Sequence, residues 1–69
     1  MPSETDDQKQ QYKFIIQSLS EGDTYFDIAD NTGEEPRFIR KQIDYLLRRY
    51  KARTKEHLIA MAFRKGVIE

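Results

Sequence analysis

Residues 24–50 read TYFDIADNTGEEPRFIRKQIDYLLRRY and carry the strongest helical pattern of the chain. Within residues 36–50, apolar side chains recur at the spacing of the buried face of an amphipathic helix. They are Ile39, Ile43, Leu46, Leu47 and Tyr50. Pro36 suits the first helical position, because its φ is fixed near the helical value and its missing N–H needs no partner there. The pattern predicts a long amphipathic helix over residues 36–50.

A shorter helix is expected just before it, over residues 25–31. Thr24 and Asp27 have the spacing of a capping box, in which each side chain accepts a hydrogen bond from the other residue's backbone amide. Ile28 and Ala29 are its predicted core contacts, and Gly33 can end it. A short helix, a glycine-containing turn and a longer basic helix are typical of a helix-turn-helix.

A first helix is predicted over residues 6–19. Its apolar face carries Tyr12, Ile15, Ile16 and Leu19. Thr5 and Gln8 resemble a second capping box in front of it, and Gly22 follows it.

A fourth helix is predicted over residues 55–65, with Thr54 as its cap and Gly66 as its stop. One of its faces carries Leu58, Ile59 and Ala62. A second face at helical spacing carries His57, Ala60, Met61 and Arg64. No strand-like alternation is present, so the expected fold is all-α with four helices.

The chain has 69 residues, which permits one domain, expected over residues 1–69 with residues 1–5 flexible. A chain of this size buries only about 60% of its unfolded surface, so a deep enzyme cleft is not expected. Cysteine is absent, which excludes disulfides and thiolate metal sites. The N-terminus is polar and acidic, and no apolar run approaches the roughly 18 residues of a membrane span. A cytoplasmic protein without a membrane partner is expected.

Charge is divided unevenly along the chain, although the formal net charge is zero. Residues 1–36 contain nine acidic and two basic residues, whereas residues 37–69 contain ten basic and three acidic ones. A basic half is a candidate footprint for a polyanion. Charged helix faces that are merely solvated would give the same pattern.

Catalytic chemistry finds little support in the sequence. His57 is the only histidine and makes a poor metal site without further ligands. No nucleophile stands at a recognisable spacing from a histidine and a carboxylate, and no glycine-rich phosphate loop is present. We therefore expect no enzyme, no cofactor and no metal.

Three blocks of the sequence align without gaps to one known pattern. Residues 22–29 read GDTYFDIA, residues 38–43 read FIRKQI, and residues 49–68 read RYKARTKEHLIAMAFRKGVI. They resemble the motifs G-x-[ST]-N-K-E-I-A, T-V-K-x-H-L and K-L-G-V-x-[SN]-R-x-x-A-V-x-x-A-x-x-x-G-L-I of the LuxR/GerE-type (FixJ/NarL-type) helix-turn-helix DNA-binding domain. The resemblance covers residues 12–68.

This resemblance implies a four-helix domain whose third helix enters the DNA major groove. It also implies that the fourth helix pairs with its counterpart in a homodimer on a two-fold DNA site. By position, Arg40 matches the DNA-facing lysine of the family, and Lys41 lies beside it. Phe38 stands where the family has a threonine at the DNA surface, and Lys51 replaces the glycine after the recognition helix.

Other departures concern the surface near the DNA. Tyr25 and Phe26 replace an Asn-Lys pair that lies near phosphate in the family, and Gln42 replaces a histidine. Glu34 and Glu35 place negative charge at the turn that approaches DNA.

The candidate DNA-contacting residues come mostly from the third predicted helix. Arg37, Arg40 and Lys41, near its start, are candidates for reading guanine edges. Arg48 and Arg49, near its end, are candidates for phosphate contacts. The full candidate set is Thr24, Arg37, Phe38, Arg40, Lys41, Asp44, Arg48 and Arg49. The candidate dimer seam is His57, Ala60, Met61 and Arg64, whose small and flexible side chains permit close packing.

Two functions are compatible with these observations. The first is a small stand-alone transcriptional regulator that binds duplex DNA as a homodimer. The second is a protein-interaction module, an anti-activator or adaptor, that keeps the fold and binds another transcription regulator or RNA polymerase. The acidic first half and the aromatic residues Tyr25, Phe26 and Phe38 would carry that binding, although one of Tyr25 and Phe26 is expected to pack in the core.

Overall fold

The computed structural model describes residues 5–69, which form four α-helices and no strand. The helices are α1 (Asp6–Ser20), α2 (Tyr25–Thr32), α3 (Pro36–Arg49) and α4 (Lys55–Arg64). The all-α prediction is confirmed for this part of the chain, and every helix begins at the expected residue and ends within one residue of the expected position. The flexibility predicted for residues 1–5 falls mainly on residues 1–4, which lie outside the described residues. Thr5 itself is held as the cap of α1.

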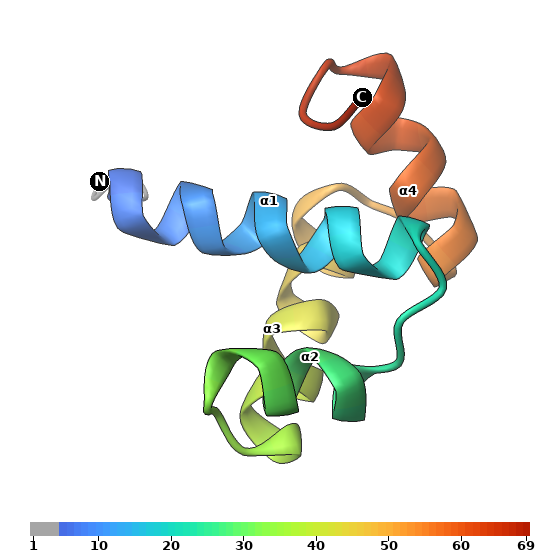
Figure 1. The fold of residues 1–69 in the computed structure, drawn as a ribbon. Helices are drawn as coiled ribbons and strands as arrows, with labels where there is room; N and C mark the ends of the chain where they lie inside the picture. The colour runs from blue at the N-terminus through green and yellow to red at the C-terminus, as the bar shows by residue number, and fades with distance from the viewer. Residues whose placement is uncertain (1–4) are drawn as a thin grey trace.

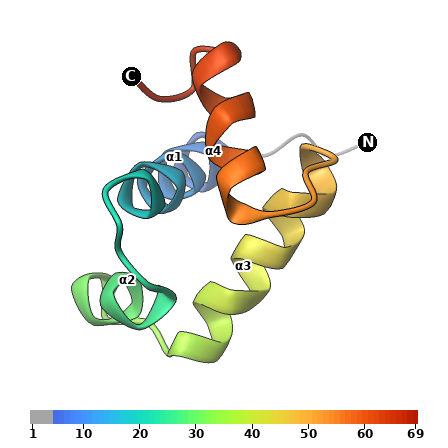
Figure 2. The same ribbon diagram turned by 90° about the vertical axis from the view of Figure 1, so that its right-hand side faces the viewer.

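The helices pack mainly as two pairs. The pair α2–α3, which are neighbours in the sequence, and the pair α1–α4, the first and last helices, make the most extensive contacts. Figure 1 shows α1 running across the molecule toward α4, with α2 and α3 on its other side. In Figure 2 α3 runs from its junction with α2 to the loop that leads into α4. The two ends of α3 therefore have different neighbours: α2 at its start, and the loop that leads into α4 at its end (Figure 2).

Side-chain caps fix where three of the helices begin. The Thr5 hydroxyl oxygen accepts a hydrogen bond from the Gln8 amide at 3.1 Å, and Gln8 Oε1 accepts one from the Thr5 amide at 2.9 Å. Thr24 and Asp27 repeat this exchange at α2, at 3.2 and 2.9 Å. Thr54 accepts from the third amide of α4 at 3.0 Å. The capping predictions are confirmed, because these side chains satisfy amides that the helices leave unpaired.

One backbone motif ends all four helices. A residue with positive φ follows each helix, and the next amide donates to the carbonyl five residues earlier at 2.8–3.1 Å, as in a Schellman motif. The left-handed residues are Gly22, Gly33, Lys51 and Gly66. Lys51, with φ of 55°, is the exception to glycine at this position, and its side chain adds strain that the other three turns lack.

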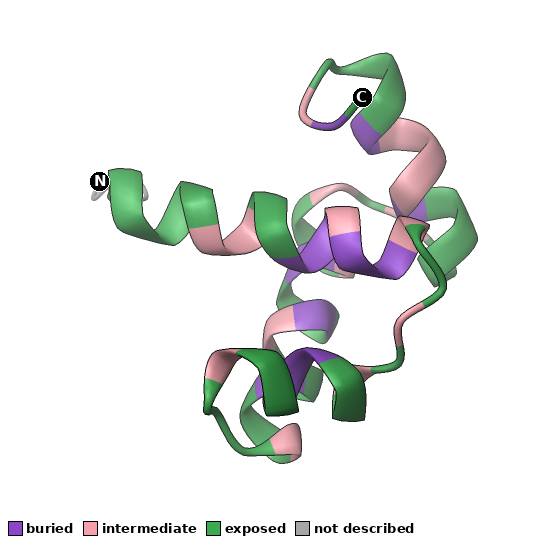
Figure 3. Cartoon of the chain, in the orientation of Figure 1, coloured by how far each residue is buried: buried purple, intermediate pink, exposed green. Residues whose placement is uncertain are grey.

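Aliphatic side chains alone make up the buried hydrophobic core of the described residues (Figure 3). They are Ile15, Ile16, Leu19, Ile28, Ala29, Ile39, Ile43, Leu46, Leu58, Ala62 and Ile68. All predicted apolar faces contribute to this core. Ile68 lies beyond α4 and was not predicted; the turn after Gly66 brings it back onto the helices. No helix among residues 5–69 combines the length and the apolar character needed to cross a bilayer.

The aromatic residues lie at the surface or at the edge of the core. All four phenylalanines are exposed: Phe14, Phe26, Phe38 and Phe63. Tyr25 packs against the core, whereas the neighbouring Phe26 is 59% exposed. The expectation that one of these two residues is a core contact is confirmed, with Tyr25 in that position.

Candidate nucleic-acid interface

One face of α3 is charged and open to solvent. It carries Arg37, Arg40, Lys41, Asp44 and Arg48, which lie at the surface, and we call this set the α3 stripe. The buried residues Ile39, Ile43 and Leu46 lie on the other side of the helix. Successive residues of an α-helix are rotated by about 100°, so this spacing directs the stripe away from the core.

The start of the stripe holds three of its four cations, Arg37, Arg40 and Lys41. They lie in the first two turns of α3, where the helix dipole contributes a further partial positive charge. Glu34 and Glu35 precede them in the turn, and Glu35 makes no side-chain cap to the helix. The positive field is therefore strongest on the outward face of the helix and weaker at the turn.

Arg49 lies apart from the stripe. Phe38, Tyr45 and Arg49 share a flank of α3 at the spacing i, i+7, i+11, and Arg49 lines a cavity toward α1. The sequence grouped Arg48 and Arg49 as equivalent phosphate candidates, but the structure places them at different surfaces. Phe38, which is 38% exposed, lies on this flank beside the start of the stripe.

Thr24 is engaged in capping α2. Its hydroxyl oxygen accepts from the Asp27 amide, and its own amide donates to the Asp27 carboxylate. The Asp27 carboxylate thus brings a negative charge to this helix N-terminus, where an anion would otherwise bind. Only the hydroxyl hydrogen of Thr24 is left to meet a phosphate oxygen.

An acidic and aromatic surface adjoins the start of α3. Phe26 stacks on Tyr25 with ring centroids 4.5 Å apart. Phe26 also lines an open depression of about 560 Å³ together with Asp27, Asp30 and Glu34. The carboxylates of this depression repel a phosphate backbone, so the depression does not extend the positively charged surface of the α3 stripe.

The candidate dimer seam lies on the surface of α4. His57 and Arg64 are exposed, and Ala60 and Met61 are half-buried. His57 Nδ1 accepts a hydrogen bond from the Arg53 amide at 3.2 Å, which holds the imidazole against the loop before α4. Phe63, 48% exposed on another flank of α4, is an apolar surface residue outside the predicted seam.

Within residues 5–69, no three histidine, aspartate or glutamate side chains are grouped so that they could hold a metal ion. The candidate interface is built instead from cations, backbone caps and exposed rings.

No protein-family model matches the chain, and comparisons with curated proteins and with solved structures give no significant match. The resemblance to the LuxR/GerE-type domain thus rests on the three sequence blocks.

Proposed function

We propose that this protein binds duplex DNA, with the first two turns of α3 in the major groove. The observation that carries the proposal is the exposure of Arg37, Arg40 and Lys41 on the outward face of α3, the longer helix of the contacting α2–α3 pair. A major groove admits an α-helix, and the N-terminal residues of a recognition helix reach the base edges.

The stripe offers a division of roles among its residues. Arginine and lysine donate hydrogen bonds to guanine O6 and N7, which suits Arg37, Arg40 and Lys41. Asp44 can accept from the amino group of cytosine, and Arg48, further along the same face, can reach a phosphate. In the proposed regulator, α4 joins two copies through the seam at His57, Ala60, Met61 and Arg64, so that two α3 helices face one two-fold DNA site.

The test is fluorescence anisotropy with a labelled random-sequence duplex at about 50 and 200 mM salt. The affinity should fall steeply between the two salt concentrations, because phosphate contacts release counterions. The double variant Arg40→Glu with Lys41→Glu should weaken binding by at least about tenfold at the lower salt, since it reverses two charges in the groove.

The matched control is Lys51→Glu with Lys55→Glu, which changes the net charge equally but lies outside the stripe. This control should retain most of the binding. Equal losses in the two variants would reduce the interaction to general charge attraction, and circular dichroism verifies that each variant is folded.

A protein-interaction module is the second candidate function, favoured by the acidic and aromatic surface. Phe26 and Phe38 expose 59% and 38% of their surface on either side of the turn that leads into α3. Exposed aromatic rings are typical anchors of protein interfaces. Absence of DNA binding at the lower salt by the folded protein would favour this function, with RNA polymerase or another transcription regulator as its partner.

A further inference from the structure

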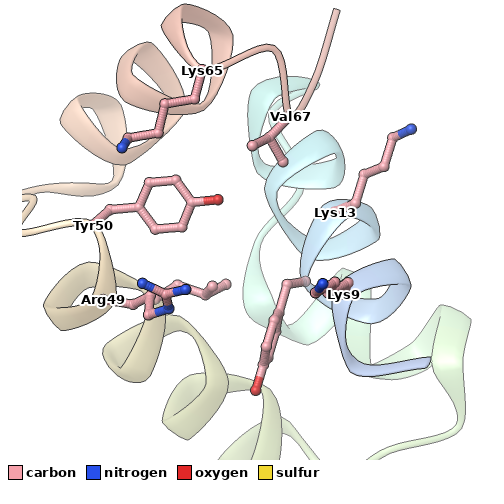
Figure 4. Close-up of a pocket in the computed structure, with 8 residues that line it drawn as sticks. Lys9, Lys13, Arg49, Tyr50, Lys65 and Val67 are labelled. Atoms are coloured by element: carbon pink, nitrogen blue, oxygen red, sulfur yellow. The ribbon is translucent and has the colours of Figure 1, made fainter. Parts of the chain in front are cut away.

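A second cluster of cations lies at the opposite end of α3. There a cavity of about 290 Å³ opens between α1, the end of α3 and the segment that follows α4 (Figure 4). The side chains that matter are Lys9, Tyr12 and Lys13 from α1, Arg49 and Tyr50 from the end of α3, and Lys65 after α4. This cavity lies outside the α3 stripe.

The described side chains that line this cavity carry only positive formal charges. Among residues 5–69, four of its lining side chains are cations and none is acidic, whereas the depression at Phe26 is lined by carboxylates and no cation. Lys9 and Lys13 are the two basic residues of the otherwise acidic first half of the chain, and both lie one helical turn apart on this cavity. Cations from three segments of the chain thus lie around one cavity, where they can bind a single anion together.

The cations surround an aromatic wall. Figure 4 shows Lys65 and Arg49 on either side of the Tyr50 ring, with Lys9 facing them from α1 and Lys13 directed outward. Lys65 Nζ lies 5.9 Å from the centroid of the Tyr50 ring, a cation–π contact. Tyr12 is held in place by stacking on Tyr45, with centroids 5.4 Å apart.

This combination matches the two parts of one ligand class. Tyrosine rings offer flat apolar surface on which a nucleobase can stack, and clustered lysine and arginine side chains bind phosphate groups. The volume lies close to the lower end of the range of small-molecule pockets, about 300–1,000 Å³. A mononucleotide therefore suits the cavity better than a larger cofactor does.

We propose that this cavity binds a nucleoside di- or triphosphate, with the base against the tyrosine rings and the phosphates among Lys9, Arg49 and Lys65. This site is separate from the proposed DNA interface, because Arg49 lies on the flank of α3 that faces α1, whereas Arg48 lies on the α3 stripe.

The experiment titrates the full chain against the fluorescent nucleotide MANT-GTP. The variant Lys9→Gln with Lys65→Gln removes two cavity cations and should weaken binding by about tenfold. The control Lys41→Gln with Lys55→Gln removes the same charge outside the cavity and should bind within about twofold of the unchanged protein. Unlabelled GTP should displace the probe.

Three results would overturn the proposal. The first is absence of binding up to about 1 mM nucleotide, which corresponds to a binding free energy weaker than about −4 kcal/mol. The second is equal displacement by inorganic triphosphate and by GTP, because the tyrosine wall would then contribute nothing. The third is an equal loss of duplex and nucleotide binding in the cavity variant, which would assign these cations to the DNA backbone. If only the DNA proposal fails, the unchanged protein binds MANT-GTP but not the duplex. The variant Arg40→Glu with Lys41→Glu should then bind MANT-GTP as the unchanged protein does.

Discussion

The two ends of α3 carry similar charges on surfaces of opposite shape. At the start of the helix, Arg37, Arg40 and Lys41 project from a convex face into solvent. At its end, Arg49 joins Lys9 and Lys65 around a cavity. A convex row of cations can enter a groove, whereas a concave ring of cations can surround a small anion. Local shape therefore distinguishes the two surfaces where charge alone does not.

The ends also differ in their neighbours. The start of α3 is preceded by Glu34 and Glu35 and lies beside the carboxylates of α2, so its positive charge is confined to the outward face. The end of α3 has Arg48 and Arg49 in its last turn, where they complement the negative end of the helix dipole. Both ends share one aliphatic core, in which Ile39 lies beneath the first and Leu46 beneath the second.

The largest expected effect comes from a substitution in the core that both ends of α3 share, because it should weaken both binding activities at once. Leu46 is 1% exposed and also lines the cavity, so Leu46→Ala should lower the free energy of unfolding by about 2–5 kcal/mol. That is a large part of the total for a domain of this size, and both binding activities should weaken together. Urea denaturation followed by circular dichroism measures it. The control Leu47→Ala should lower the free energy of unfolding by less, because Leu47 is only half-buried. An equal loss in the two variants would contradict this prediction.

Adjacent arginines provide a sharper separation of the two ends. Arg48 lies on the α3 stripe and Arg49 on the cavity. Arg48→Gln should weaken duplex binding several-fold and leave nucleotide binding unchanged, because a single phosphate contact is lost. Arg49→Gln should do the reverse. Duplex anisotropy and MANT-GTP titration measure the two effects, and each variant serves as the control for the other. If both variants weakened the same activity, the two surfaces would be one.

The smallest expected effect concerns the residue just beyond the second end. Lys51 has a φ of 55°, a conformation that costs an L residue about 1–2 kcal/mol relative to the right-handed form. Lys51→Gly removes this strain, while the greater freedom of glycine in the unfolded chain offsets about 0.4–1 kcal/mol of the gain. We expect a net stabilisation of about 0.5–1 kcal/mol in urea denaturation. Lys51→Ala keeps the strain and should bring no such gain; a similar gain from alanine would assign the effect to the lost charge.

The sequence predicted the helices well because their signals are local. Capping residues at Thr5, Thr24 and Thr54, and the glycines that follow three of the helices, act within a few positions of the helix ends. The left-handed Lys51 after α3 carried no such signal. The apolar spacing in residues 36–50 correctly identified Ile39, Ile43 and Leu46 as buried. Such patterns depend only on helical geometry.

The basic cavity could not be predicted in the same way. Lys9 and Lys65 are far apart in the sequence and meet only because α4 packs on α1. Their proximity depends on the tertiary arrangement, for which neither residue carries a local signal. The concentration of lysine at positions 9 and 13 within an acidic segment was the one available indication. Burial of Ile68 was missed for a related reason, since it follows the last helix and has no periodic neighbours.

The pairing of α1 with α4 has a consequence for the order of folding. The α2–α3 pair joins neighbouring helices, whereas α1 and α4 lie at the two ends of the chain. Because the entropy lost on closing a loop grows with its length, we expect α2–α3 contacts to form early and α1–α4 contacts to form last. During synthesis the chain emerges N-terminus first, so α1 must wait for residues 55–68 before it gains its partner. The α2–α3 pair can therefore form on the ribosome before the cavity at the end of α3 exists.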